Sequence, residues 1–139
     1  MSAQSATRRM THVDLAKMRA TGEKISVLTC YDASFAALCD ATGVDALLIG
    51  DSLGMVLQGR DSTLAVTLDE MAYHTQCVVR GNRCGWIIAD LPFGSYHASV
   101  AQAVDAAVRL MQSGAHMVKL EGGGWTVPVV AALVARGVP

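Results

Sequence analysis

Charged side chains stand at the ends of three short apolar runs in this sequence. Asp51 with Ser52 follows one run, Asp90 follows the next, and Lys119 with Glu121 ends a third. Carboxylate oxygens are hard ligands that suit Mg²⁺, which keeps several waters and leaves positions for a substrate oxygen. No cysteine or histidine pattern of the kind that zinc prefers lies near them. Brought together, the three carboxylates would bind a divalent cation, and Lys119 would pair with a substrate carboxylate.

Each of these residues also has an ordinary structural interpretation when it is taken alone. Asp51 and Asp90 are typical turn or capping residues, and Lys119 with Glu121 is a common solvated pair. The glycine run at 122–124 favours a tight turn between strand and helix over a phosphate cradle, since no phosphate-binding fingerprint accompanies it. The functional interpretation therefore depends on a fold that brings the charged residues together.

Histidine and tryptophan add little to this chemistry in the sequence. His12, His74, His97 and His116 are predicted to be structural or solvated, although His97 follows the third apolar run closely enough to touch a ligand. Both tryptophans, at 86 and 125, are predicted to pack in the protein rather than to stack on nucleotides.

Apolar runs rich in β-branched residues alternate with stretches of helical periodicity along the chain. Strands are predicted at 26–30, 45–49, 86–89 and 116–120, and helices at 13–19, 33–42, 68–80, 99–112 and 127–135. Thr67 with Glu70 predicts a capping box, and Thr126 is the expected N-cap of the last helix. Phe35 and Leu38, with Cys39, mark the expected apolar face of the second helix.

This alternation predicts an α/β fold with a parallel sheet covered by helices. In such folds the C-terminal ends of the strands face one side, so the charged residues would meet at one mouth. The pattern alone leaves two architectures open, namely a doubly wound sheet and half of an eight-stranded barrel.

Composition narrows the class of protein further. Net charge is −1 and 52% of the 139 residues are hydrophobic, which predicts one packed domain and no attraction to nucleic acid. No signal peptide or run of about 20 apolar residues is present, so no membrane partner is expected. Four cysteines without a CxxC pair indicate reduced thiols and a cytoplasmic protein. Residues 1–10 are expected to form a flexible tail.

Six segments in order resemble the ketopantoate hydroxymethyltransferase family, over about residues 11–139. The segments are Thr29-Cys30-Tyr31-Asp32, Gly50-Asp51-Ser52-Leu53-Gly54, Asp61-Ser62-Thr63-Leu64, Tyr73-His74-Thr75, Ala89-Asp90-Leu91-Pro92-Phe93-Gly94-Ser95-Tyr96 and Val118-Lys119-Leu120-Glu121-Gly122-Gly123. The resemblance implies a (β/α)8 TIM barrel of which this chain supplies roughly the first four βα units. Residues 1–139 are thus expected to be a single domain, the N-terminal half of that barrel.

The family's chemistry gives these residues expected roles. Its members transfer a hydroxymethyl group from 5,10-methylenetetrahydrofolate to 3-methyl-2-oxobutanoate and form ketopantoate, through an enolate stabilised by Mg²⁺. By motif, Asp51, Asp90 and Glu121 would bind Mg²⁺, with Glu121 bound directly or through water. Asp51, Ser52, Asp90 and Lys119 would bind the oxoacid. The general base is expected beyond Pro139, in the half of the family's sequence that this chain does not include.

The resemblance also implies partners and leaves alternatives. Family members form large homo-oligomers, often decamers, and a half barrel needs the missing half from a longer polypeptide, a second chain or self-association. Residues 1–139 alone are therefore expected to lack transferase activity. One alternative is a Mg²⁺-dependent carbon–carbon lyase or mutase of the phosphoenolpyruvate mutase and isocitrate lyase type, acting on a 2-oxoacid. The other alternative is a non-catalytic fragment that only binds oxoacid or assembles with other subunits.

Overall fold

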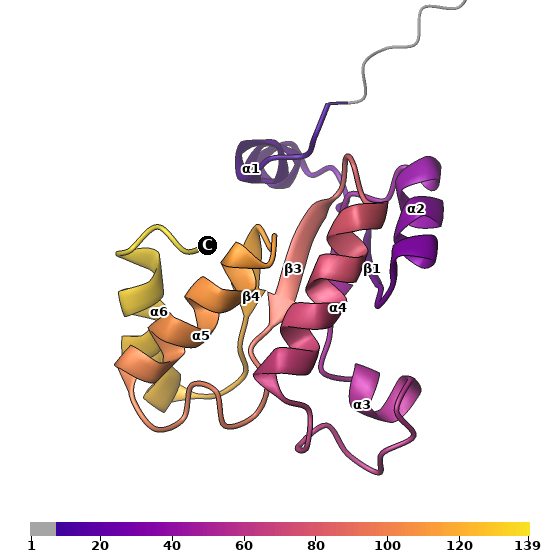
Figure 1. Ribbon diagram of the computed structural model, residues 1–139. Helices are drawn as coiled ribbons and strands as arrows, with labels where there is room; N and C mark the ends of the chain where they lie inside the picture. Colours follow the sequence, from indigo (N-terminus) through magenta and orange to yellow (C-terminus); the bar gives the residue numbers. More distant parts are fainter. Residues whose placement is uncertain (1–7) are drawn as a thin grey trace, which may run out of the picture.

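The computed structural model describes residues 8–139 and shows strands and helices alternating along the chain (Figure 1). The strands are β1 (Val27–Thr29), β2 (Ala46–Ile49), β3 (Trp86–Asp90) and β4 (Met117–Lys119). The helices are α1 (His12–Thr21), α2 (Ala33–Thr42), α3 (Leu53–Val56), α4 (Leu68–Gly81), α5 (Val100–Gln112), the 3₁₀ turn η1 (Gly124–Thr126) and α6 (Val127–Val134). All four expected strands and all five expected helices are present, and α3 is an additional short helix.

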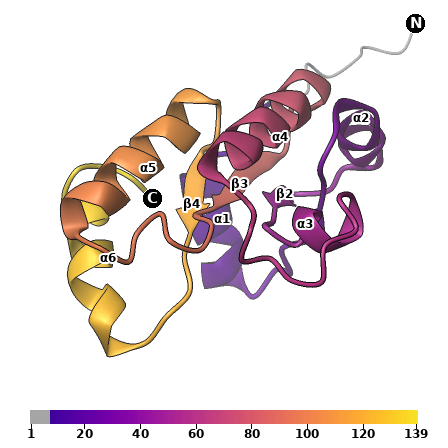
Figure 2. The same ribbon diagram turned by 60° about the horizontal axis from the view of Figure 1, so that its bottom comes forward.

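The four strands form one parallel sheet in the order β1-β2-β3-β4. Four helices, α2, α4, α5 and α6, lie in a curved row along one side of it (Figures 1 and 2). Leu47 and Ile49 of β2 and Ile87 and Ala89 of β3 are at most 1% exposed, because they face this row. A sheet whose strands follow in sequence and whose helices cover one face is the arrangement of half a βα barrel, and differs from a doubly wound sheet.

The opposite face of the sheet is less covered. The register places Thr29, Leu48, Ile88 and Met117 in one row across the four strands, and the last three are only half-buried. Beyond β4, the N–H of Val118 donates to the carbonyl of Pro139, 3.1 Å away. Residues after α6 therefore return to the free edge of β4, as the start of a following parallel strand would.

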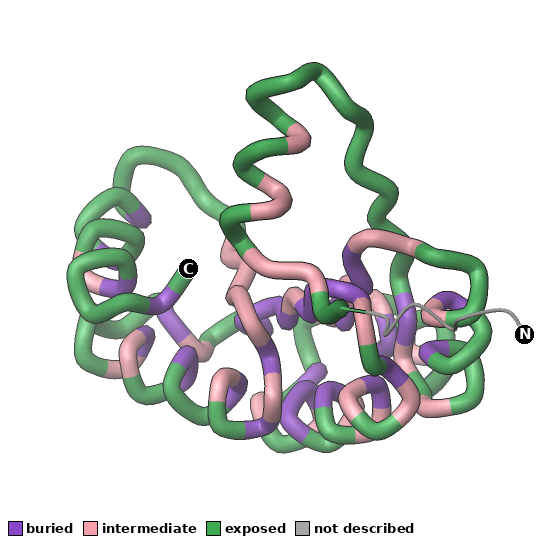
Figure 3. The backbone as a smooth tube through the Cα atoms, turned by 90° about the horizontal axis from the view of Figure 1, so that it is seen from above, coloured by how far each residue is buried: buried purple, intermediate pink, exposed green. Residues whose placement is uncertain are grey.

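The helix α1 lies on the other side of the sheet from the helix row. Its segment projects from the body and has no buried residue (Figure 3). A capping box between Thr11 and Asp14 begins the helix. Of the expected flexible tail, residues 1–7 lie outside the described part, and Arg9 and Met10 hydrogen-bond to the carbonyls of Arg83 and Cys84. Among the described helices, none combines the length and the apolar character needed to span a membrane.

Local sequence signals were confirmed in α4 but not in α6. Thr67 and Glu70 form the expected capping box, with each side chain bonded to the other's backbone N–H. Thr126 precedes α6 as expected, but its hydroxyl donates to the carbonyl of Gly123 at 2.7 Å and does not cap the helix. The prediction of a side-chain cap was wrong because the turn η1 leads directly into α6, so Thr126 already has a helical backbone.

The buried face of α2 also differs from the expected one. Ala36 and Cys39 are buried, whereas Phe35 is 45% exposed and Leu38 is 57% exposed. Small residues face inward because α4 approaches closely at this point. A Cβ atom on Gly81 of α4 would lie only 2.1 Å from the carbonyl oxygen of Ala33, so this position has no room for a side chain.

Candidate functional site

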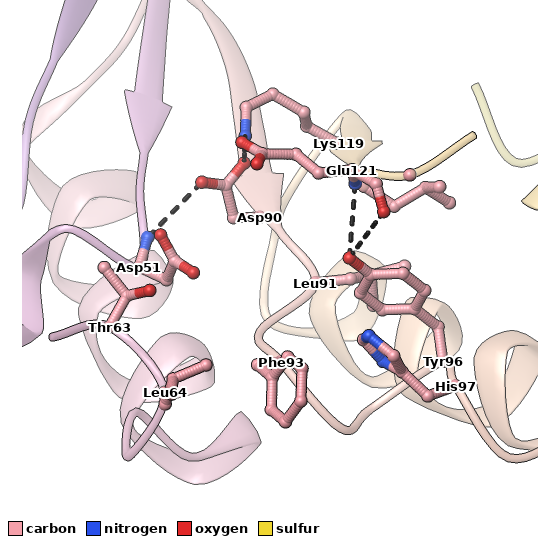
Figure 4. A pocket seen from close by; sticks show the side chains of 12 residues that line it. Asp51, Thr63, Leu64, Asp90, Leu91, Phe93, Tyr96, His97, Lys119 and Glu121 are labelled. Atoms are coloured by element: carbon pink, nitrogen blue, oxygen red, sulfur yellow. Dashed lines mark hydrogen bonds and ion pairs between the residues drawn. The ribbon is translucent and has the colours of Figure 1, made fainter.

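The parallel sheet brings the charged residues to one end of the strands. Asp51 follows β2, Asp90 is the last residue of β3, and Lys119, the last residue of β4, is its partner in the register. These residues line a cavity of about 340 Å³ (Figure 4). The cavity is lined by Asp51, Thr63, Leu64, Asp90, Leu91, Phe93, Tyr96, His97, Lys119, Leu120, Glu121 and Gly122. The prediction that one mouth gathers the charged side chains is confirmed.

Asp90 lies at the centre of the charged group. Its side chain is only 7% exposed. Oδ2 accepts a hydrogen bond from the N–H of Asp51 at 3.3 Å, and Oδ1 lies 2.7 Å from Nζ of Lys119. Burial raises the pKa of Asp90, and the negative charge of Asp51 adds to this, while the contact with Lys119 opposes it. A buried carboxylate that depends on one ammonium for compensation is a suitable ligand for a cation.

Lys119 joins the two carboxylates on its side of the cavity. Its Nζ lies 2.7 Å from Asp90 and 3.1 Å from Oε1 of Glu121, whose side chain is 83% exposed. Burial disfavours the ammonium, but the bonds and charges of Asp90 and Glu121 outweigh burial and raise the pKa of Lys119. Lys119 therefore carries a positive charge at neutral pH. Its contact with Glu121 agrees with the expectation that residues two apart on an extended strand share one face.

Ser52 lies beside this cavity and is held by a chain of hydrogen bonds. Its Oγ is 2.8 Å from the hydroxyl of Tyr31, which follows β1. The carbonyl of Tyr31 is in turn 2.8 Å from Nδ1 of His74 on α4. Nδ1 must carry the proton in this pair because a carbonyl only accepts. His74 thus has the structural role that the sequence indicated, and it fixes the residue that orients Ser52.

The absence of a side chain at Gly50 leaves room for the side chains of Ser52 and Asp90. Gly50 ends the run before Asp51, and a Cβ atom there would lie 2.9 Å from Oγ of Ser52 and 3.5 Å from Oδ2 of Asp90. The first distance is shorter than real Cβ contacts, so a side chain would displace Ser52. Ser52 and Asp90, both predicted to bind the substrate, therefore lie close to the backbone at Gly50.

The carboxylates at the cavity could bind a hard cation such as Mg²⁺ with two residues, and not with the three that the sequence predicted. Asp51 and Asp90 lie side by side at the cavity, and Oδ1 of Asp90 is buried with no partner in good hydrogen-bond geometry. Within residues 8–139 no group of three or more acidic, histidine or cysteine side chains is close enough to hold a metal ion. Glu121 lines the same cavity but pairs with Lys119. Two carboxylates with water and substrate oxygens are a common Mg²⁺ environment, so Asp51 and Asp90 fit the ion.

Several lining residues had no role in the sequence interpretation. Thr63 and Leu64 come from the loop before α4, and Phe93, Tyr96 and His97 come from the loop after β3. His97 reaches the cavity, as its place after the third strand allowed. For Phe93 and Tyr96 the available signal was a cluster of aromatic residues shortly after Asp90, and for Thr63 and Leu64 it was their place in a segment that resembles the family.

Comparison of sequences finds close relatives. A sequence model of the family described as ketopantoate hydroxymethyltransferase matches residues 9–139. A 3-methyl-2-oxobutanoate hydroxymethyltransferase of Acidovorax sp. (strain JS42) is 62% identical over 129 residues, which are 90% of this chain and 44% of that protein. The protein of that name from Dechloromonas aromatica (strain RCB) is 58% identical over all of this chain and 51% of its own length. The chain thus spans about half the length of the curated relatives it matches.

Comparison of folds finds solved structures that this chain also matches over about half of their length. A crystal structure of 2,3-dimethylmalate lyase, a member of the PEP mutase/isocitrate lyase superfamily, matches with a TM-score of 0.65. The match covers 91% of this chain and 49% of that chain at 16% identity, and a second crystal form gives a TM-score of 0.62. At such low identity the likeness shows the fold alone, and the fold is the (β/α)8 barrel, of which this chain supplies about half.

Proposed function

Because this chain belongs to the ketopantoate hydroxymethyltransferase family, we propose that it forms the oxoacid-binding part of an enzyme that makes ketopantoate. The substrates are 3-methyl-2-oxobutanoate and 5,10-methylenetetrahydrofolate. The observation that carries the proposal is the cavity in which Asp51, Asp90 and Lys119 meet at the ends of three consecutive βα units. The names of the relatives supply the reaction, and these three residues supply the charges it needs.

The reaction balances without an oxidant or a reductant. C3 of the oxoacid loses a proton and forms a carbon–carbon bond to the methylene carbon of the donor. Both carbon–nitrogen bonds of that methylene break, and water supplies the hydroxyl group of the product. The proton from C3 and one proton from water replace the methylene on the two donor nitrogens. Tetrahydrofolate and ketopantoate are the products.

Asp51 and Asp90 would hold Mg²⁺ in this proposal, with Glu121 reaching it through water. When bound, Mg²⁺ supplies Lewis-acid stabilisation for negative charge on the keto and carboxylate oxygens of the oxoacid. Glu121 is outside the direct ligand set because its carboxylate is 83% exposed and is paired with Lys119. The proposal therefore keeps two of the three expected carboxylates, Asp51 and Asp90, as direct ligands of the ion.

Lys119 and Ser52 would bind the oxoacid itself. The ammonium of Lys119 pairs with the substrate's anionic oxygens and offsets the charge that grows as C3 loses its proton. Ser52 would donate its hydroxyl hydrogen to a substrate oxygen. In that arrangement the hydroxyl of Tyr31, 2.8 Å away, would donate to Ser52 Oγ and keep it in place. The group that takes the C3 proton is proposed to lie after Pro139. In line with this, the half barrel would act with the other half and within a homo-oligomer.

One assay tests the function. The intact protein, in which residues 1–139 are completed by the other half of the barrel, is incubated with 3-methyl-2-oxobutanoate, 5,10-methylenetetrahydrofolate and Mg²⁺, and ketopantoate is measured by mass spectrometry. Product should require the folate and should disappear when a chelator removes the ion, and it should return with added Mg²⁺. Absence of ketopantoate, or carbon–carbon cleavage of an oxoacid adduct without folate, would contradict the proposal.

A further inference from the structure

Four aromatic rings from two loops lie together beside the charged residues. Phe93, Tyr96 and His97 belong to the loop after β3, and Trp125 belongs to η1 after β4. The ring of His97 lies 4.6 Å from Phe93, 4.4 Å from Tyr96 and 5.1 Å from Trp125, measured between centroids. Tyr96 and Trp125 stack with 3° between their planes. The loops thus form one aromatic cluster.

The cluster is held in place, and its outer rings are exposed while Tyr96 is buried. The hydroxyl of Tyr96 donates to the carbonyl of Glu121 at 2.9 Å and accepts from its N–H at 3.3 Å. Nδ1 of His97 accepts from the N–H of Gly94 at 3.1 Å, so in the neutral ring the hydrogen is on Nε2. Despite these bonds, Phe93 is 55% exposed and Trp125 is 51% exposed. Rigid aromatic surface that remains open to solvent is a feature of ligand sites.

The cluster and the charged residues belong to the same cavity. Asp90, Lys119 and Glu121 lie at one end of it, and Phe93, with Tyr96 and His97, lies at the other end (Figure 4). Phe93 also lines a neighbouring, larger cavity that extends toward α5. A ligand bound against Phe93 would therefore adjoin an anion at Lys119 and would still have room to extend outward.

We propose that Phe93 and the rings packed behind it bind the planar pterin ring of the one-carbon donor. This inference rests on the proposed function, in which the donor's methylene must come within bonding distance of C3 of the oxoacid. In that function the charged end binds the oxoacid, so the donor's ring would lie close to it, and the adjacent end of the cavity offers aromatic side chains. A flat heteroaromatic ring gains stacking energy on such side chains, and Nε2–H of His97 offers a hydrogen bond to its heteroatoms.

The test compares two phenylalanines in the intact protein. Phe93→Ala should raise the KM for 5,10-methylenetetrahydrofolate about tenfold, while the KM for the oxoacid changes less than about twofold. Phe93→Tyr should restore the donor KM, since it keeps the ring. Phe35→Ala is the matched control, because Phe35 is 45% exposed on α2 and lies away from both cavities. Calorimetric binding of tetrahydrofolate should weaken in Phe93→Ala alone.

The outcomes separate this inference from the function on which it rests. If the unmodified protein makes ketopantoate and Phe93→Ala binds tetrahydrofolate as tightly as before, the aromatic site is wrong and the function stands. A loss that affects both substrates equally would also overturn the site, since it would indicate a general disturbance of the cavity. If the unmodified protein neither binds tetrahydrofolate nor turns over, the function and the inference both fail.

Discussion

The backbone N–H of Asp51 donates to Oδ2 of Asp90 at 3.3 Å, and this bond connects the ends of two neighbouring parallel strands. It leaves Oδ1 of Asp90 directed toward Lys119 on β4. One buried carboxylate thus contacts residues from both flanking βα units. The relation explains why the site depends on strand order, since β3 lies between β2 and β4 in the sheet.

Replacing either aspartate should remove Mg²⁺-dependent binding of the oxoacid. Asp51→Ala and Asp90→Ala each delete one of the two carboxylates proposed to hold the ion, and Lys119 alone binds a carboxylate only weakly in water. Isothermal calorimetry with 3-methyl-2-oxobutanoate and Mg²⁺ should give no binding heat for either variant. Glu23→Gln, an exposed change beyond α1, is the control and should bind normally. Unchanged oxoacid affinity in either alanine variant would refute the ligand assignment.

Gly50→Ala should weaken oxoacid binding without removing any polar group. The added methyl group would lie 2.9 Å from Oγ of Ser52, so this side chain has to move away from its position beside Tyr31. We expect about a tenfold loss of oxoacid affinity, corresponding to one lost hydrogen bond. Gly124→Ala is a suitable control because a Cβ there meets nothing within 4 Å. Equal effects of the two substitutions would show that the contact at Gly50 is unimportant.

Removing one hydroxyl tests the support of Ser52. Tyr31→Phe deletes the partner that lies 2.8 Å from Ser52 Oγ but retains the ring and the backbone carbonyl bonded to His74. The oxoacid KM should rise about fivefold, with a smaller change in the KM for the folate, because only the orientation of Ser52 is lost. Tyr73→Phe on α4 is the matched control, since that ring is 62% exposed. A rise in both KM values would argue against a specific role for Tyr31.

Sequence reasoning predicted the charged end of the site because strand periodicity determines it. Asp51, Asp90 and Lys119 lie at the ends of apolar runs. Parallel strands place such residues at the same end of the sheet, and this placement does not depend on the conformation of the loops. The pattern left two roles open for Glu121, a metal ligand and a solvated pair with Lys119. It could not choose between them, since a long exposed side chain selects its partner in three dimensions. The ligand identity and the general base remain predictions.

The aromatic end of the site depends on loop paths that periodicity does not describe. Trp125 was expected to be a packing residue; it does pack on Tyr96, but it remains 51% exposed. The same limitation applies to α2, where the close approach of Gly81 to Ala33 decides which residues face inward. Spacing of apolar residues predicts that a helix has a buried face, whereas the neighbouring helix selects the side chains that fit there.

Asp40→Asn should destabilise the fold in a pH-dependent way. The carboxylate of Asp40, which is 4% exposed, accepts from the backbone N–H groups of Cys84 and Arg83 at 2.7 and 3.0 Å and so attaches the turn before β3 to α2. Burial acts to raise the pKa of Asp40, but these bonds and the Arg83 guanidinium outweigh it and lower the pKa below 3.8. The asparagine keeps an acceptor without the charge, so about 1–2 kcal/mol of unfolding free energy should be lost at pH 7.

The direction of the pH effect follows from that lowered pKa. A carboxylate whose pKa is depressed in the folded state stabilises the fold above the pKa of the unfolded chain, and this contribution declines as pH falls through the folded-state pKa. Urea unfolding of the intact protein at pH 7 and near pH 3 should therefore show a smaller difference between Asp40→Asn and the unmodified protein at the lower pH. Asp61→Asn, an exposed loop substitution, should show little difference at pH 7. If Asp40→Asn lowered the free energy of unfolding equally at both pH values, the shape of the side chain and not its charge would explain the role of Asp40. A contribution from charge has to shrink at low pH, because protonation neutralises the carboxylate.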